Sequence, residues 1–364
     1  MEQISESGNN IIMQEDMEYL ANDQKIPIDK LQNSTVLVTG ATGLLGSQIV
    51  RYLLCLNRVK KYDIKVIALA RNEKKAVNIF GELLKNRNLK TYYKDIVTFE
   101  KINERVDYII HTASMTASKA FVQKPVETIE TAIWGTNNLL KFAQETGIKG
   151  MVYLSSLEVY GTTDFNLPEI SEESYGYIEP LDPRSSYSEG KRMAECLCSA
   201  YFHEYGLPVK IVRLTQTFGP GVDYNDNRVF AQFARSIIEK RDIILHTKGE
   251  TVRDYCYSRD AIAAIFTVLI KGEEGEAYNV ANEETTISIY DMAYLLTDIY
   301  KDTGIKVKIQ LDDIQKHGYA PKLKIKLDVK KLKELGWNAE VSLAESYERL
   351  IRSMILSKGQ VHSC

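Results

Sequence analysis

The chain has 364 residues, of which 44% are hydrophobic and 26% charged, and its formal net charge at pH 7 is −3. These values are typical of a soluble globular enzyme and give no reason to expect a nucleic acid or an anionic membrane as partner. The longest apolar run, residues 261–270, is about half of the roughly 20 residues that a spanning helix needs. Dispersed cysteines and histidines and a polar N-terminus indicate no disulfide framework, metal site or secretory signal, so we expect a cytoplasmic protein.

Residues 1–33 are polar, and we expect an N-terminal extension that includes a short helix near residues 14–21. From residue 34 onward, short apolar segments alternate with longer segments of helical pattern. This alternation predicts a Rossmann-like, doubly wound α/β fold, in which helices cover both faces of a parallel sheet. The expected strands are residues 35–39, 64–70, 106–111, 150–155 and 209–214, and the helices between them include 44–56, 128–146 and 188–205.

The pattern becomes less regular after residue 215. We therefore expect a dinucleotide-binding domain over residues 34–215 and a smaller, mainly substrate-binding cap over residues 216–364. Within the latter range, residues 240–265 are expected to return to the first domain. Helices are expected at residues 227–240 and 258–271, and the lysine-rich residues 316–333 are interpreted as a solvated face of the cap.

A glycine-rich segment lies directly between the first expected strand and the first expected helix. In the sequence Thr-Gly-Ala-Thr-Gly-Leu-Leu-Gly, residues 39–46, the glycines are spaced three and three apart. They allow a tight turn, close approach of a pyrophosphate, and close packing of helix on strand. The helix N-terminus offers free N–H groups and a positive dipole end to the phosphates. The residues predicted to bind a dinucleotide here are Gly40, Thr42, Gly43, Leu44, Leu45 and Gly46.

The end of the second expected strand bears on the choice of cofactor. An NAD site usually has an acidic residue there, whereas this chain has Ala70 and Arg71. A cation suits the 2′-phosphate of NADP, although Arg71 could also stack on the adenine or face solvent. Asp95 and Ile96 follow the next strand-like segment and are candidates for contact with the adenine, unless Asp95 is a solvated loop residue. The residues leave NAD and NADP open and slightly favour NADP.

Tyr187 and Lys191 form a Tyr-x-x-x-Lys pair, which places both side chains on one face of a helix. An ammonium beside a phenol, with the positive nicotinamide nearby, favours the phenolate and lowers the pKa of the tyrosine. Such a tyrosine can take a proton from a sugar hydroxyl while hydride leaves the same carbon. The alternative is an ordinary surface pair. The strand that ends at Ser156 favours the catalytic interpretation, because it brings a hydroxyl to the carboxyl edge of the sheet, where ligands bind.

Three motifs, TGATGLLG, SSLEVYG and YSEGK, follow one another in an order and at separations that resemble the extended short-chain dehydrogenase/reductase superfamily. Within it, the chain resembles the NAD-dependent epimerase/dehydratase group, which acts on nucleotide sugars. The resemblance extends from about residue 34 to beyond residue 290. It implies transient oxidation of a nucleotide-sugar substrate by a tightly bound, recycled NAD or NADP. It also implies a homodimer, formed through the helices at residues 128–146 and 188–205.

The resemblance also implies roles for individual residues. Ser156 would hydrogen-bond the sugar hydroxyl that is oxidised, Tyr187 would act on its proton, and Lys191 would also hold the nicotinamide ribose. Arg253 would bind the substrate diphosphate, the alternative being a surface ion pair with Asp254 or Glu250. Further expected contacts are Ala113 for the cofactor and Gln216, Arg228 and Val229 for the substrate.

The residues after Ser156 bear on the reaction. The 4,6-dehydratases of the group carry an Asp-Glu pair after the catalytic hydroxyl residue, whereas this chain has Leu157 and Glu158. Leucine cannot donate a proton, and plain 4-epimerases usually lack the glutamate. UDP-glucuronate decarboxylases keep the glutamate alone and also resemble this chain at residues 187–195 and 125–131.

The hypothesis is therefore a decarboxylase-like reaction through a 4-keto intermediate. A 4-epimerase and a 4,6-dehydratase are the alternatives, and a non-catalytic NAD(P)-binding sensor is the alternative of a different class. Glu158 would take part in the chemistry or serve as a structural hydrogen-bond acceptor. Gln216 departs from the asparagine that these decarboxylases typically have at that position.

Overall fold

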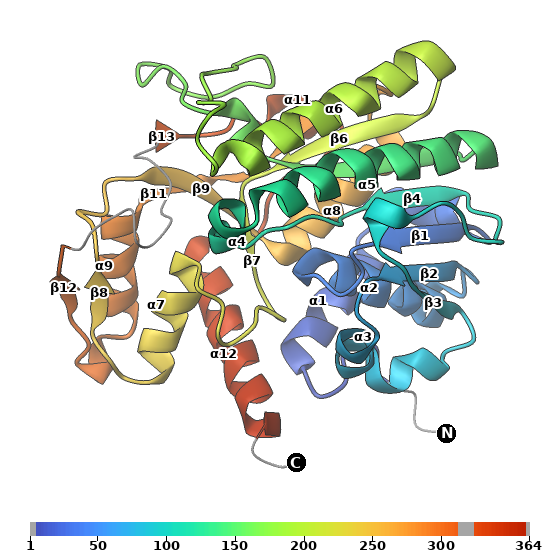
Figure 1. The fold of residues 1–364 in the computed structure, drawn as a ribbon. Helices are drawn as coiled ribbons and strands as arrows, with labels where there is room; N and C mark the ends of the chain where they lie inside the picture. The colour runs from blue at the N-terminus through green and yellow to red at the C-terminus, as the bar shows by residue number, and fades with distance from the viewer. Residues whose placement is uncertain (1–4, 312–323, 362–364) are drawn as a thin grey trace.

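A parallel sheet of seven strands, in the order β10-β6-β5-β4-β1-β2-β3, forms the centre of a computed structural model that describes residues 5–311 and 324–361 (Figure 1). Its strand order reverses between β1 and β4, and ligands bind at such a reversal, outside the carboxyl ends of the strands. The predicted fold class is thus confirmed. The strands are β1 (Thr35–Thr39), β2 (Lys65–Ala70), β3 (Leu89–Tyr93), β4 (Tyr108–His111), β5 (Gly150–Ser156), β6 (Val209–Leu214) and β10 (Ala277–Val280).

Helices cover both faces of this sheet (Figure 1). One face carries α2 (Leu44–Lys60) and α8 (Ser258–Lys271), and the other carries α5 (Pro125–Thr146) and α6 (Ser185–Tyr205). In β1 the side chain of Leu37 enters one core, while those of Val36 and Val38 enter the other. Burial on both faces explains why the strands are continuous apolar segments in the sequence. Two short helices, α3 (Glu73–Phe80) and α4 (Ser118–Gln123), lie in the connections.

The chain returns to the large sheet through α8 and then β10, which pairs with β6. The expected return over residues 240–265 overlaps this segment only at residues 258–265. The preceding strands pair in the smaller sheets instead: β8 (Ile243–Leu245) with β12, and β9 (Val252–Tyr257) with β7, β11 and β13.

The smaller lobe has an apolar core of its own, which includes Phe218, Phe230 and Tyr347. The last of these lies on α12, a long helix that the sequence pattern did not predict. The lysine-rich prediction falls partly on residues 312–323, which lie outside the described residues. The elements of this lobe are β7 (Gln216–Phe218), β8, β9, β11 (Asn282–Ser288), β12 (Val307–Ile309), β13 (Lys324–Ile325), α7 (Val229–Ile238), α9 (Ile289–Ile299) and α12 (Leu343–Val361). The short helix α11 (Lys330–Glu334) instead contacts β10, and its Leu332 is buried in the core of the large sheet.

The N-terminal extension is packed into the fold. Its helix α1 (Ile11–Asn22) is longer than the expected helix and contacts α2, α8 and α12. Ile12, Met17 and Leu20 are buried there. The extension therefore touches both lobes. Within the described ranges, no helix has the length and apolar character to cross a membrane.

Candidate active site

The loop between β1 and α2 is closely packed at its glycines. Gly40 has a φ of +60°, and a Cβ atom there would lie 2.7 Å from the backbone of Ala113. A Cβ atom on Gly46 would lie 2.3 Å from the carbonyl oxygen of Gly40. Helix α2 begins after Gly43 without a side-chain cap, so the N–H groups of its first turn have no capping side chain as partner. This is the arrangement that binds a phosphate at a helix N-terminus, and the loop fits a dinucleotide.

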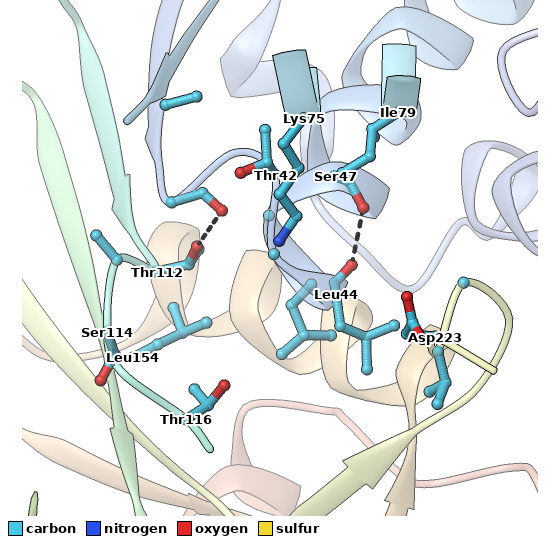
Figure 2. Close-up of a pocket in the computed structure, with 18 of the residues that line it drawn as sticks. Thr42, Leu44, Ser47, Lys75, Ile79, Thr112, Ser114, Thr116, Leu154 and Asp223 are labelled. Carbon is cyan, nitrogen blue, oxygen red and sulfur yellow. Dashed lines mark hydrogen bonds between the residues drawn. The ribbon is translucent and has the colours of Figure 1, made fainter. Parts of the chain in front are cut away.

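A cavity of about 1610 Å³ runs along the carboxyl edge of the sheet. Figure 2 shows Thr42 and Leu44 on one side of it, Thr112 and Ser114 from the loop after β4 on another, and Asp223 from the smaller lobe opposite. The structure thus gathers the predicted cofactor residues around one space. Those that line the cavity are Gly40, Thr42, Gly43, Leu44, Leu45, Gly46, Arg71, Asp95, Ile96, Ala113, Tyr187 and Lys191.

Arg71, the residue that favoured NADP, faces two carboxylates. Its Nη1 atom lies 3.2 Å from Oε1 of Glu127 and 3.6 Å from Oδ2 of Asp95. The side chain is 58% exposed, so these pairs are screened by solvent, yet they balance much of the positive charge at this edge. The position therefore favours NADP less than the sequence indicated.

Three of the four predicted catalytic residues, Ser156, Tyr187 and Lys191, lie together at the end of β5. The ring of Tyr187 stacks on that of Phe121 at a centroid distance of 4.3 Å, and the hydroxyl of Ser156 is a hydrogen-bond partner of its phenol. Lys191 Nζ lies 5.9 Å from the centre of the Tyr187 ring and donates a hydrogen bond of 2.6 Å to the carbonyl of Leu154. Phe121, which holds the plane of the tyrosine ring, was not identified from the sequence.

Burial controls the protonation of this group. It lowers the pKa of Lys191, which is 3% exposed, to about 8. Burial and the Glu158 carboxylate raise the pKa of Tyr187, while the Ser156 hydrogen bond, Arg228 and Arg184 lower it. The net direction in the protein by itself is upward, opposite to the sequence prediction, because burial disfavours the phenolate more than the nearby cations favour it.

Glu158 is held by an arginine that was not predicted from the sequence. Arg184 Nη1 and Nη2 donate hydrogen bonds of 3.0 Å to Oε2 and Oε1 of Glu158, and Ser188 Oγ adds one of 3.1 Å. The side chains of Arg184 and Glu158 are only 15% and 17% exposed. The neighbouring Leu157 is buried and apolar. Arg184 and Ser188 are four residues apart at the start of α6, a spacing that could have indicated a shared partner.

The predicted substrate residues are divided between two places. Gln216 and Arg228 line the cavity, and Arg228 Nη2 lies 2.6 Å from Oδ2 of Asp226. The described residues that line the cavity include neither Val229 nor Arg253. Arg253 lies on β9 near Tyr255, whose pKa its charge lowers against the effect of burial.

Asp254, one of the two alternative ion-pair partners of Arg253, is buried and has other partners. Its carboxylate accepts hydrogen bonds from Thr286 Oγ1 at 2.5 Å and from the backbone N–H of Leu327 at 2.6 Å. These bonds tie β9 to β11 and to the residues that follow β13. Asp254 therefore has a structural environment inside the smaller lobe.

The doubly wound sheet, the phosphate loop and the Ser156, Tyr187 and Lys191 cluster define a dinucleotide-dependent enzyme of the extended short-chain dehydrogenase/reductase type. The sequence profile of the NAD-dependent epimerase/dehydratase family matches residues 36–281, and the chain belongs to this family. The predicted family, its enzymatic nature and its use of NAD(P) are thus confirmed.

Among curated relatives, UDP-glucuronic acid decarboxylase 1 of Xenopus tropicalis is 28% identical over 336 residues, covering 90% of this chain and 75% of that protein. dTDP-D-glucose 4,6-dehydratase of Dictyostelium discoideum is 29% identical over 283 residues, covering 74% and 63%. Among solved structures, dTDP-glucose 4,6-dehydratase from Streptomyces venezuelae with NAD bound superposes with a TM-score of 0.71 at 26% identity, covering 90% of this chain and 98% of that one.

Proposed function

We propose that this chain modifies a nucleotide sugar through a transient 4-keto intermediate, and that the net reaction removes the C6 carboxylate of a UDP-glucuronate-type substrate. The catalytic cluster at the end of β5 and the similarity to UDP-glucuronic acid decarboxylases support this proposal. The observation that carries the choice of reaction is the pair of residues after Ser156: a buried leucine, then a glutamate clamped by Arg184.

A bound NAD(P) would supply a reversible hydride acceptor for the sugar. The glycine loop would hold its phosphates and Lys191 its ribose. Tyr187 takes the proton of the C4 hydroxyl, and Ser156 hydrogen-bonds the same oxygen. The Phe121 ring, stacked on Tyr187, keeps the phenol in one orientation. This lowers the entropic cost of reaching a reactive geometry.

Elimination of water from a 4-keto sugar needs a base for the C5 proton and an acid for the departing C6 hydroxyl. Leu157 can supply no proton, and both oxygens of Glu158 already accept hydrogen bonds from Arg184. Decarboxylation needs neither group to start. The electron pair of the C5–C6 bond moves toward the C4 carbonyl and carbon dioxide leaves. C5 then gains a proton, and Glu158 would take part in this later step.

Mass spectrometry of the products from a panel of nucleotide sugars tests the proposal. We expect loss of carbon dioxide from UDP-glucuronate. Loss of water from a nucleotide hexose would identify a dehydratase, and a new sugar of unchanged mass an epimerase. A protein that holds its cofactor and turns over none of the panel would be a sensor. The variant Glu158→Gln should still oxidise UDP-glucuronate but should not complete the reaction; an unchanged product profile would remove Glu158 from the mechanism.

We also propose a homodimer that forms through α5 and α6. These helices pack side by side, and their outer surface exposes large apolar side chains, among them Trp134 and Met193. Large apolar side chains that are exposed on a helix surface favour a protein interface there. Light scattering of the protein and of a Trp134→Lys variant would test this: a monomeric parent protein would contradict the proposal.

A further inference from the structure

Part of the N-terminal extension forms one wall of the active-site cavity. We call residues 5–13 the N-terminal wall. It faces the first turns of α2, which carry Ser47 and Arg51, and the end of α3 at Ile79. This is the side of the cavity on which the phosphate loop lies (Figure 2). The residues of the wall that line the cavity are Ser5, Ser7, Gly8, Asn9, Asn10 and Met13.

A buried glutamine holds the N-terminal wall in one conformation. Gln14 Oε1 accepts hydrogen bonds from the backbone N–H of Ser7 at 3.0 Å and from Ser5 Oγ at 2.8 Å. Its Nε2 donates one of 2.8 Å to the carboxylate of Glu6. Glu6 in turn pairs with Arg58 of α2, whose Nε lies 2.8 Å away. These hydrogen bonds order the N-terminal wall, and the ion pair with Arg58 attaches it to α2.

The N-terminal wall is also attached to the smaller lobe. Asn10 Nδ2 donates a hydrogen bond of 2.8 Å to Ser353 Oγ of α12, which also accepts one of 3.3 Å from the N–H of Gly221. Met13 packs so closely that a Cβ atom on Gly221 would lie 2.8 Å from its Cε. The same point lies 3.8 Å from Cδ1 of Leu44, the first residue of α2. The wall thus sits where the phosphate loop meets the smaller lobe.

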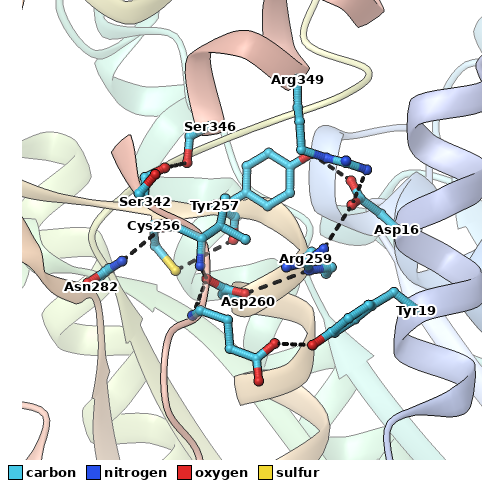
Figure 3. Close-up of polar contacts among 12 residues, drawn as sticks. Asp16, Tyr19, Cys256, Tyr257, Arg259, Asp260, Asn282, Ser342, Ser346 and Arg349 are labelled. Atoms are coloured by element: carbon cyan, nitrogen blue, oxygen red, sulfur yellow. Dashed lines mark hydrogen bonds and ion pairs between the residues drawn. The ribbon is translucent and has the colours of Figure 1, made fainter. Parts of the chain in front are cut away.

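Helix α1, which continues from the N-terminal wall, is anchored to both lobes by Asp16. Asp16 is fully buried and accepts hydrogen bonds of 2.7 Å from Tyr257 Oη and 2.8 Å from Arg349 Nη2 (Figure 3). Arg259 of α8 lies 3.7 Å from the same carboxylate. Because these partners come from α8, β9 and α12, the anchor joins the two lobes.

Two buried polar groups at the N-terminal wall have no hydrogen-bond partner in the described part of the chain. They are Ser7 Oγ and Arg51 Nε, on side chains that are 7% and 8% exposed and that line the cavity. The other guanidinium nitrogens of Arg51 donate to the carbonyls of Glu6 and Ile79. Buried hydroxyls and N–H groups are nearly always hydrogen-bonded, so an unpaired one at a cavity wall points to a ligand that completes it.

We propose that the N-terminal wall is part of the dinucleotide site: the Ser7 hydroxyl donates a hydrogen bond to the bound NAD(P), and the locked wall slows cofactor release between turnovers. Phosphate oxygens and ribose hydroxyls both accept hydrogen bonds, which suits the neutral hydroxyl and amide groups of the wall. An enzyme that returns its hydride to the same substrate gains from keeping its cofactor. The proposal rests on NAD(P) dependence and not on which sugar is modified.

Cofactor release from the full-length protein tests the proposal directly. The protein is loaded with NADH, an excess of NAD is added, and the release rate is followed by fluorescence. Ser7→Ala should release NADH about 3- to 10-fold faster, the effect of one lost hydrogen bond. Its thermal stability without cofactor should not change, since the hydroxyl has no protein partner. Gln14→Leu should speed release more strongly, because it frees the whole wall.

Tyr19→Phe is the matched control. Tyr19 lies on the same helix as Gln14 and is not among the described residues that line the cavity. The substitution removes its 2.5 Å hydrogen bond to Glu340. Its release rate should equal that of the parent protein. If Gln14→Leu does not fold, Ser7→Ala decides alone. An unchanged release rate in Ser7→Ala would overturn the proposal, as would a variant that binds UDP more weakly while keeping its NADH.

Discussion

The clamp between Arg184 and Glu158 makes the sharpest energetic prediction. Replacing Arg184 with glutamine removes two charge-assisted hydrogen bonds and leaves the carboxylate with only Ser188. Both side chains are mostly shielded from water, so we expect the change to cost about 2 to 3 kcal/mol. If this whole free-energy cost is a loss of transition-state stabilisation, kcat/KM falls roughly 30- to 150-fold.

A double-mutant cycle measures the clamp itself. The parent protein, the single variants Arg184→Gln and Glu158→Gln and the double variant are compared by thermal unfolding. We expect a coupling free energy of about 2 kcal/mol between the two positions. Arg184→Lys should recover only part of it, because an ammonium cannot make both parallel bonds.

An exposed pair supplies the control for this cycle. Lys85 and Glu82 are three residues apart and largely exposed, at 73% and 67%, so their cycle should show no measurable coupling. If Arg184 and Glu158 also couple by less than about 0.5 kcal/mol, the clamp does not hold the glutamate and the argument from it fails.

Three further predictions concern the catalytic and phosphate-binding residues. Tyr187→Phe should abolish turnover while the cofactor stays bound, because only the phenolic hydroxyl is removed; near-normal rates would contradict its assignment. Burial lowers the pKa of Lys191 to about 8, so activity that needs the ammonium should fall as the pH rises through about 8. Lys191→Arg should lose this fall in a pH profile, since the guanidinium stays charged; an identical profile would assign the fall to another group. Gly46→Ala should abolish cofactor binding, because its Cβ would lie 2.3 Å from the Gly40 carbonyl oxygen. Gly43→Ala makes a 3.2 Å contact with the same oxygen and should bind the cofactor, but more weakly than the parent protein, as measured by calorimetry. Equal affinities for the two variants would refute this reading of the loop.

Much of the fold is encoded in local patterns. The strand at residues 35–39 and the helix at residues 258–271 lie where the sequence predicts them, because both are continuous apolar segments with clear ends. Helix α12 was not predicted, because its apolar residues form only one stripe among charged ones. That stripe packs against the core of the smaller lobe, which the local sequence does not indicate.

The glycine loop at residues 40–46 and the pair of Tyr187 and Lys191 can be predicted from the sequence alone, since each depends on spacing within one turn or one helix. Ser156 is predicted from its place at the end of a strand. The folded structure is needed to find the partners of Glu158, the place of Arg253 outside the cavity wall, and the position of residues 5–13 beside the phosphate loop. These contacts join segments that are tens to hundreds of residues apart. Which side chains meet across such distances depends on how the two lobes pack together. The local periodicity of the sequence does not predict these contacts.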